Sequence, residues 1–238
     1  MEAMRSGNYP SKRSGDLVRF MKEIPIQRVC HIMARLRAPD GCPWDQEQNH
    51  HSLRFHAVEE VYELIDAIEM ENDGEMREEL GDLLLQVIFH CQLAHERKAF
   101  DFDAVCTELA DKLVRRHPHV FGDKTIEDVE GVWTQWEAVK RSEKKGTLGE
   151  RHSALDGIPR HLPALQYAEK MAKKARKVAP LSDHLQAPSL PKSADQFAEA
   201  LLDQVIAAQA KGWSPEILLR EAIRRREQTW RAVEANHS

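Results

Sequence analysis

The sequence predicts an all-α protein, a bundle of long amphipathic helices joined by short turns. Apolar residues recur every three or four positions over long stretches, which is the period of a helix with one buried face. No stretch shows a convincing strand pattern. The 238 residues are 42% hydrophobic, enough to fill a sizeable core. Long helices separated by short turns are typical of a helical bundle.

The helices are expected in a definite order. A flexible tail, residues 1–24, precedes a helix from Ile26 to Leu36, which is broken by Pro-Asp-Gly at 39–41. Four further helices are expected: one capped by Ser52 and reaching about Glu71, one from Glu75 to about Arg97, one capped by Asp101 or Asp103 and ending near Arg116, and one that begins at a capping box of Thr125 and Asp128 and ends before Gly146.

Prolines become frequent beyond Gly146, which predicts a change of organisation. Residues 146–194 are expected to form a linker with one short basic helix from Tyr167 to Val178. Residues 195–238 are helical again, with Gly212 and Pro215 separating two helices. The first domain is accordingly placed at residues 25–145.

Charge and cysteine content restrict the function classes. The formal net charge of −5 argues against broad nucleic-acid binding. The four cysteines form no Cys-x-x-Cys pair, which argues against a zinc knuckle or a dithiol redox motif. No stretch approaches the ~20 apolar residues that span a bilayer, and the polar N-terminal residues lack the apolar segment of a secretory signal. We therefore expect a cytoplasmic protein with no membrane partner.

Five carboxylates on the second and third predicted helices are candidate site residues: Glu59, Glu60, Glu63, Glu79 and Asp82. On each helix the acidic side chains are three or four residues apart and share a face. A short turn joins the helices antiparallel, so the two acidic faces can converge. An isolated acidic pair is more often a solvated face, but the apolar run at 83–89 directly follows Asp82 and favours partial burial.

Partial burial of clustered carboxylates predicts a bound cation. Like charges brought together repel one another, and some shift toward protonation unless a cation neutralises them. Oxygen ligands without a neighbouring His or Cys select Mg²⁺ or Mn²⁺ over zinc or copper. Because Mg²⁺ retains waters and accepts phosphate oxygens, phosphate chemistry follows more naturally than a structural site.

The carboxylate pattern resembles that of a known family. The segments Glu59-Glu60-Val61-Tyr62-Glu63 and, fifteen residues later, Glu79-Leu80-Gly81-Asp82 resemble the Glu-Glu-x-x-Glu and Glu-x-x-Asp signature of MazG-like all-α nucleoside triphosphate pyrophosphohydrolases. Flanking segments from Gly41 to Asp45 and from Lys112 to Phe121 strengthen the resemblance. Together these motifs cover roughly residues 25–145.

The resemblance implies a fold, a reaction and a set of ligands. It implies a helical bundle of the MazG-like type, completed by a homodimer, that hydrolyses nucleoside triphosphates to a monophosphate and pyrophosphate in nucleotide-pool housekeeping. It also implies Mg²⁺ ligands, with Glu59 supporting them or acting as a base. The implied ligands are Glu60, Glu63, Glu79 and Asp82.

Candidate substrate-binding residues are cationic or aromatic. Arg115, Arg116 and Lys140 suit phosphate oxygens, because Arg makes bidentate contacts and Lys offers a point charge. A solvated helix end is an equally good interpretation of each of them. Trp44 and Trp136 can stack on a nucleobase or serve as packing anchors.

A weak internal repeat is also visible. The run at 83–88 recurs 118 residues later at 201–206, where Ala200 stands in place of Asp82. Some MazG-like proteins carry two such domains, so residues 195–238 resemble a degenerate second repeat that lacks the acidic ligands. A chance similarity between leucine-rich helices is the alternative.

Two other functions fit parts of the sequence. A di-iron bundle needs two Glu-x-x-His motifs, and Glu47 to His50 supplies only one, outside the acidic helix. A regulatory or nucleotide-binding module without hydrolysis would use the basic residues of the second half: Lys170, Lys173, Lys174, Arg176, Lys177 and 224–226. Clustered carboxylates that cost stability without a metal favour the enzyme.

Overall fold

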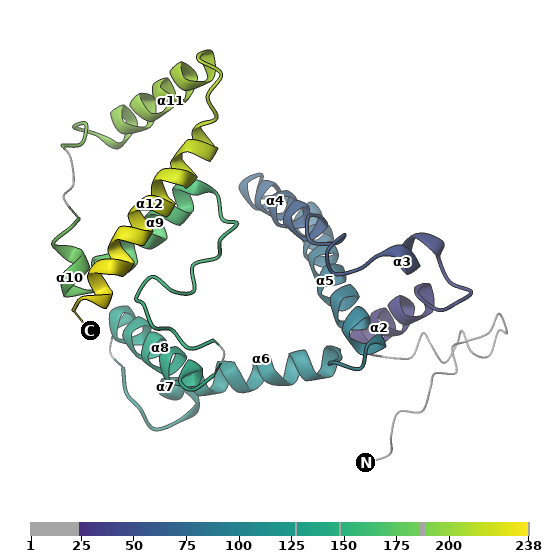
Figure 1. Ribbon diagram of the computed structural model, residues 1–238. Coiled ribbons are helices and arrows are strands. Elements are labelled where there is room, and N and C mark those ends of the chain that lie inside the picture. The colour runs from purple at the N-terminus through teal and green to yellow at the C-terminus, as the bar shows by residue number, and fades with distance from the viewer. Residues whose placement is uncertain (1–23, 127, 148, 186–188, 238) are drawn as a thin grey trace. The chain divides into compact units, whose positions relative to one another are not determined.

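The structure, a computed structural model, describes residues 24–126, 128–147, 149–185 and 189–237 (Figure 1). Every regular element in these ranges is a helix, which confirms the all-α prediction. The predicted flexible tail, residues 1–24, lies outside the described residues except for Ile24. None of the described helices is both long enough and apolar enough to cross a bilayer.

The chain forms two compact units, one ending at Thr125 and the other beginning at Ile126. The predicted division into parts at residues 24, 145 and 194 stays a prediction. The helices of the first unit are α2 (Pro25–Leu36), α3 (Pro43–Glu47), α4 (His56–Glu69), α5 (Asp73–Glu96), α6 (Phe102–Arg116) and α7 (Pro118–Phe121).

Helices α4 and α5 form an antiparallel hairpin, and α2 packs against α5 (Figure 1). The core beside this hairpin consists of buried residues from α2, the segment before α4, and the C-terminal half of α5: Met33, Leu53, Ile88, Phe89 and Leu93. The N-terminal half of α5 carries Glu79 and Asp82 and contributes no residue to this core. The buried half of α5 therefore anchors a helix whose other half presents acidic side chains.

Side-chain caps set the starts of α6 and α5, and the first of these was predicted. Asp101 caps α6 by accepting a hydrogen bond from the backbone N–H of Ala104 at 2.8 Å. Helix α5 begins at Asp73, two residues before the predicted start at Glu75, because the Asn72 side chain caps it by accepting from the N–H groups of Gly74 and Glu75. These caps satisfy backbone donors that have no partner inside the helix.

Two other predicted caps are wrong. Ser52 lies in a turn, where its hydroxyl donates to the Asn49 carbonyl at 3.0 Å, and α4 begins four residues later at His56. Thr125 does not cap α8, because Asp128 takes that place by accepting from the N–H of Gly131 at 2.7 Å. At α8 a side chain closer to the helix provides the cap, whereas α4 begins without a side-chain cap.

The second unit contains α8 (Val129–Lys144), α9 (Ala164–Ala175), α10 (Ala179–Ser182), α11 (Ala194–Ala210) and α12 (Pro215–Ala235). Its core joins Ile223 and Trp230 of α12 to residues between 155 and 181. The segment expected as a linker thus supplies much of this core. The short basic helix expected at Tyr167–Val178 is α9, which starts and ends three residues earlier. Gly212, with φ of +71°, separates α11 from α12 as predicted.

Candidate metal centre

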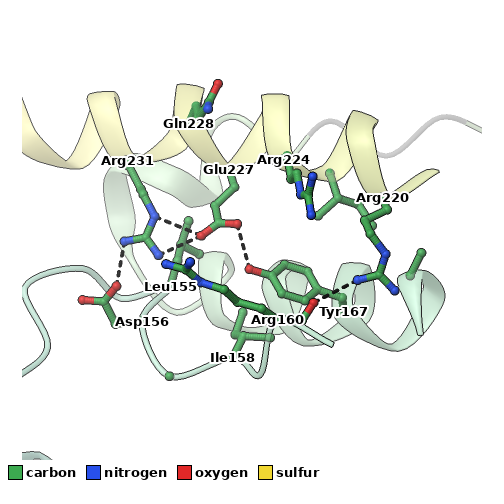
Figure 2. A pocket seen from close by; sticks show the side chains of 13 residues that line it. Leu155, Asp156, Ile158, Arg160, Tyr167, Arg220, Arg224, Glu227, Gln228 and Arg231 are labelled. Carbon is green, nitrogen blue, oxygen red and sulfur yellow. Dashed lines mark hydrogen bonds and ion pairs between the residues drawn. The ribbon is translucent and has the colours of Figure 1, made fainter. Parts of the chain in front are cut away.

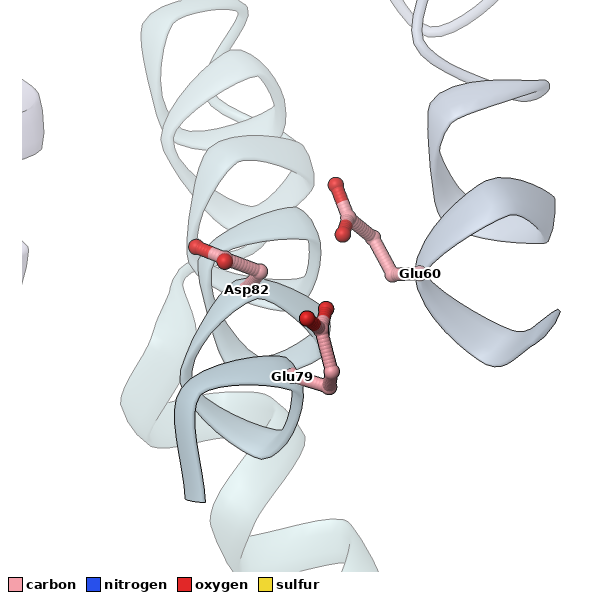
Figure 3. A group of neighbouring side chains, drawn as sticks. All are labelled: Glu60, Glu79 and Asp82. Atoms are coloured by element: carbon pink, nitrogen blue, oxygen red, sulfur yellow. The ribbon is translucent and has the colours of Figure 1, made fainter. Parts of the chain in front are cut away.

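Three carboxylates from the α4–α5 hairpin converge on one point. Glu60 lies on the face of α4 that also carries buried Ala67, while Glu79 and Asp82 lie one turn apart on α5 (Figure 3). One oxygen from each of the three side chains can be chosen so that all lie within 4.8 Å of one another. Each side chain is only partly buried, so the cluster remains accessible from solvent.

The carboxylates in this cluster repel one another when they are ionised, and this repulsion contributes to raised pKa values. Burial raises the pKa of Glu60 above its usual range, and the neighbouring charges of Asp82 and Glu63 add to the shift. The pKa of Glu79 is likewise raised, first by burial and then by the charges of Glu63, Asp82 and Glu60. A hydrogen bond of 3.2 Å from Gln86 Nε2 to Glu60 Oε1 opposes the shift at Glu60. A bound cation would offset the repulsion between the carboxylates, which the hydrogen bond does not remove.

The donor set fits a hard divalent cation. The three converging ligand atoms are carboxylate oxygens, and no His or Cys belongs to this group within the described residues. Gln86, buried one turn after Asp82, leaves its Oε1 atom without a hydrogen-bond partner among the described residues. A hydrated cation would supply the donor that this buried oxygen lacks.

The other two predicted carboxylates lie beside the cluster. Glu63 acts electrostatically on both Glu60 and Glu79, but the group of mutually close oxygens consists of Glu60, Glu79 and Asp82. Glu59 is exposed, and its carboxylate lies 3.2 Å from His56 Nδ1. The predicted quartet is thus observed as a close trio with Glu63 next to it.

The predicted substrate-binding residues are spread over both units. Trp44 lies on α3, is about half exposed, and makes an edge contact with the His56 ring at the start of α4. Arg115 and Arg116 lie in the last turn of α6. Trp136 and Lys140 lie on α8 of the second unit, where the Lys140 ammonium sits 4.5 Å from the Trp136 ring centroid. Their role in binding stays a prediction.

Sequence reasoning did not identify Gln86, or the pair formed by His90 of α5 and His50 of the segment before α4. His90 stacks on His50, with ring centroids 5.0 Å apart and a distance of 2.8 Å between the two Nδ1 atoms. Burial lowers the pKa of both histidines, which favours a neutral pair in which one ring donates to the other. The signal in the sequence is the four-residue spacing of Asp82, Gln86 and His90 along one helix face.

Arg37 ties the segment before α4 to α5. Its guanidinium makes a bidentate ion pair with Glu96 at 2.7 and 2.8 Å and donates to the backbone carbonyls of Asp45 and Gln48. These bonds connect α3, which carries Trp44, to the C-terminal end of α5. The position of α3 relative to α5 therefore depends on Arg37 and Glu96, which lie outside the carboxylate motif.

Fold and site together define a class: an all-α protein in which a helical hairpin presents carboxylates suited to a divalent cation. Residues 48–121 match the family model of the MazG nucleotide pyrophosphohydrolase domain. The match includes all five predicted carboxylates. The chain belongs to the MazG nucleotide pyrophosphohydrolase family.

Curated proteins show the same relationship. A nucleoside triphosphate pyrophosphohydrolase of Escherichia coli strain K12 is 47% identical over 154 residues, which are 64% of this chain and 58% of that protein. A nucleoside triphosphate pyrophosphohydrolase/pyrophosphatase MazG of Thermotoga maritima is 44% identical over 160 residues, 66% of this chain and 60% of that protein. The matches thus span less than two thirds of the length of these two proteins.

A further relative extends the similarity into the second unit. A Streptomyces cacaoi protein named as an uncharacterized 26.1 kDa protein in the blaB 3' region is 41% identical over 196 residues. The match covers 82% of this chain and 76% of that protein. Because 196 residues exceed the length of the first unit, the similarity includes part of the second.

Proposed function

We propose that this protein hydrolyses nucleoside triphosphates to a nucleoside monophosphate and pyrophosphate with the help of Mg²⁺, as a housekeeping enzyme of the nucleotide pool. The observation that carries the proposal is the convergence of Glu60, Glu79 and Asp82 at the α4–α5 hairpin. Family membership and the two relatives named as triphosphate pyrophosphohydrolases support it. We assign the activity to residues 25–145 and no metal site to the degenerate repeat at 195–238.

We propose that carboxylates from both α4 and α5 bind the cation. Glu60, Glu79 and Asp82 hold the cation, and Glu63 serves as a fourth ligand from the next turn of α4. When bound, Mg²⁺ (or Mn²⁺) supplies positive charge for the triphosphate and lowers the pKa of water. Gln86 positions Glu60 through its hydrogen bond. Glu59 is proposed to act as a general base or to assist the metal ligands from beside them.

Substrate contacts are proposed for aromatic and basic residues of α3, α6 and α8. Trp44 and Trp136 offer faces for a nucleobase. Arg115, Arg116 and Lys140 offer positive charge to phosphate oxygens. The substrate class is a nucleoside triphosphate, without a stated base preference.

The reaction is tested by anion-exchange analysis of products after incubation with a panel of nucleoside triphosphates and Mg²⁺. We expect monophosphate and pyrophosphate from the wild type and at least about a 100-fold lower rate from Asp82→Asn, because a charged ligand is lost. Asp66→Asn, an exposed carboxylate of α4 outside the cluster, should retain wild-type turnover.

Two results would contradict the proposal. Nucleoside diphosphate and inorganic phosphate as products would show cleavage between the β- and γ-phosphates, whereas the proposal requires cleavage between the α- and β-phosphates. Absence of turnover for every triphosphate, with nucleotide binding retained, would favour a regulatory module instead of an enzyme.

We also propose a homodimer. The outer face of α4 exposes a continuous apolar stripe in the single chain, formed by Val58, Val61, Tyr62, Ile65 and Ile68. On α5, Leu84 and Val87 are each 40% exposed. A second copy that covered these apolar faces would complete a helical bundle around the acidic helices.

A further inference from the structure

The second unit contains a pocket of about 440 Å³ between α9, α12 and the segment that precedes α9 (Figure 2). Its floor is apolar, with buried Leu155, Ile158 and Ile223 among the lining residues. The volume lies in the range of small-molecule sites in proteins. The charged groups that line it are four arginines and two carboxylates: Arg160, Arg220, Arg224, Arg231, Asp156 and Glu227.

Both carboxylates of the pocket are already neutralised within the protein. Asp156 accepts from Arg231 at 2.7 Å and from the backbone N–H groups of His152 and Ser153 at 3.0 Å. Glu227 accepts from Arg231 at 2.7 and 3.0 Å and from the Tyr167 hydroxyl at 2.7 Å. These contacts leave the carboxylates little capacity to bind a cationic ligand.

Arg220 is also engaged. It donates to the carbonyl oxygens of Arg160 and Leu162 at 2.9 and 2.8 Å, and it forms an ion pair with Glu216. Glu216 in turn accepts from the N–H of Ala164 at the start of α9. Arg220 therefore serves the fold by fastening the segment before α9 to α12.

Two guanidinium groups of the pocket remain without such contacts. Within the described residues, neither Arg160 nor Arg224 makes a side-chain hydrogen bond or an ion pair, and both are exposed at the pocket (Figure 2). Arg160 lies close enough to act electrostatically on the Tyr167 hydroxyl. The pocket thus offers unused donors and a positive charge above an apolar floor.

We propose that this pocket binds a small molecule that carries a phosphate or diphosphate group, held by Arg160 and Arg224. Planar guanidinium groups match the oxygens of such anions with bidentate hydrogen bonds. The apolar floor and the Tyr167 ring accommodate the rest of a nucleotide, whereas inorganic pyrophosphate would use the arginines alone. The occupancy of this pocket is independent of hydrolysis at the carboxylate cluster.

A nucleic-acid backbone is the less suitable occupant. Its recognition requires a positive stripe that follows many phosphates, and the formal net charge of the chain is −5. Arg226, two residues further along α12, lies over the Trp230 ring and does not line the pocket. A pocket with two available arginines fits one or two phosphates.

The test is isothermal titration calorimetry on the full chain in EDTA, with inorganic pyrophosphate and AMP as separate probes. EDTA prevents binding through a cation at the carboxylate cluster. The variants are Arg224→Ala and Arg160→Ala, with Arg225→Ala as the matched control, because Arg225 is an exposed neighbour that does not line the pocket. Asp82→Asn serves as a second control that disables the carboxylate cluster.

We expect at least one probe to bind the wild type, Asp82→Asn and Arg225→Ala with affinities within about threefold of one another. Either pocket variant should weaken binding at least tenfold, which distinguishes a bidentate contact from general surface charge. Tighter binding of AMP than of pyrophosphate would identify a nucleotide as the ligand, and the reverse would identify the free diphosphate.

Three outcomes would overturn the proposal. Neither probe binds at millimolar concentration, Arg225→Ala weakens binding as much as the pocket variants, or Asp82→Asn abolishes binding. The last outcome would assign the bound anion to the carboxylate cluster. Since neither Arg160 nor Arg224 makes a side-chain contact that the fold needs, each variant provides an independent check if the other fails to fold.

Discussion

At the scale of single residues, Glu60 occupies a position that is unfavourable for a carboxylate in the metal-free protein. It is partly buried between two helices, close to Asp82 and Glu63, and it receives one hydrogen bond from Gln86. Without a cation, this carboxylate is charged in a place where burial and neighbouring charges oppose its ionisation. The same arrangement becomes favourable once a divalent cation binds.

Replacement of Glu60 by Gln is therefore expected to stabilise the metal-free protein. Gln retains an acceptor for Gln86 and removes a charge whose pKa is raised, so at pH 7.5 the thermal midpoint should rise by about 2–4 °C. Since the folded-state pKa lies above the unfolded value, the wild type loses this penalty as the pH falls through the folded pKa, and the gain should be clearly smaller at about pH 4.5.

Thermal unfolding in EDTA at both pH values measures this effect, with Glu69→Gln as the control at an exposed position of α4. A lower midpoint for Glu60→Gln at pH 7.5 would show that Glu60 is not repelled in the metal-free state. A gain of the same size for Glu69→Gln would show a general effect of net charge.

The residues of the candidate site were predictable from sequence only where they repeat at helical spacing. Glu60, Glu79 and Asp82 follow that spacing and have a recognisable motif. The pairing of His50 with His90 depends on the path of the loop before α4, which is fixed by Arg37 and its partners on distant segments. No local pattern contains that information.

At the scale of elements, the α4–α5 hairpin depends on small side chains at its contact. Ala67 is 2% exposed on α4, in contrast to the exposed apolar stripe on the opposite side of the helix. A small residue at this position allows the two helices to approach closely. The approach determines whether Glu60 reaches the acidic side chains of α5.

The substitution Ala67→Leu is expected to destabilise the protein by about 1–3 kcal/mol, because the larger side chain has no space in the packed contact. It should also weaken Mn²⁺ binding by separating Glu60 from Glu79 and Asp82. Urea denaturation and metal titration measure the two effects. The neighbouring exposed position provides the control, since Ile68→Leu conserves volume. Unchanged stability and unchanged Mn²⁺ binding in Ala67→Leu would refute this account of the hairpin.

Helix positions were more predictable than helix ends. The 3.6-residue period located the long helices, because it reflects which side chains are buried. The ends depend on competing caps: Asp128 displaces Thr125 at α8, and the turn that contains Ser52 delays the start of α4. Short helices such as α3 and α7 are not evident from periodicity, since each is about one turn long.

At the scale of the whole molecule, each unit has a core of its own. The core of the first unit is centred on α5, and that of the second joins α9 and α12. The prolines between 159 and 180 suggested a linker, yet buried residues of this segment pack against α12. Proline frequency indicated irregular backbone there correctly, but it gave no information about burial.

The proposed homodimer is tested by sedimentation analysis of Ile65→Lys. A charge in the centre of the exposed α4 stripe should convert a dimer to a monomer, because it would have to be buried in the interface. Leu165→Lys, at an exposed apolar position of α9, should leave the dimer intact. A wild-type monomer at micromolar concentration, or equal dissociation of both variants, would contradict the proposed interface.

The central claim is that Glu60, Glu79 and Asp82 form one divalent-cation site, and Mn²⁺ titration followed by electron paramagnetic resonance tests it most directly. The wild type and Glu78→Gln, a neighbouring exposed carboxylate, should bind Mn²⁺ with affinities within about twofold, whereas Glu79→Gln should weaken binding by more than about tenfold. Equal binding by Glu79→Gln and the wild type would contradict the claim.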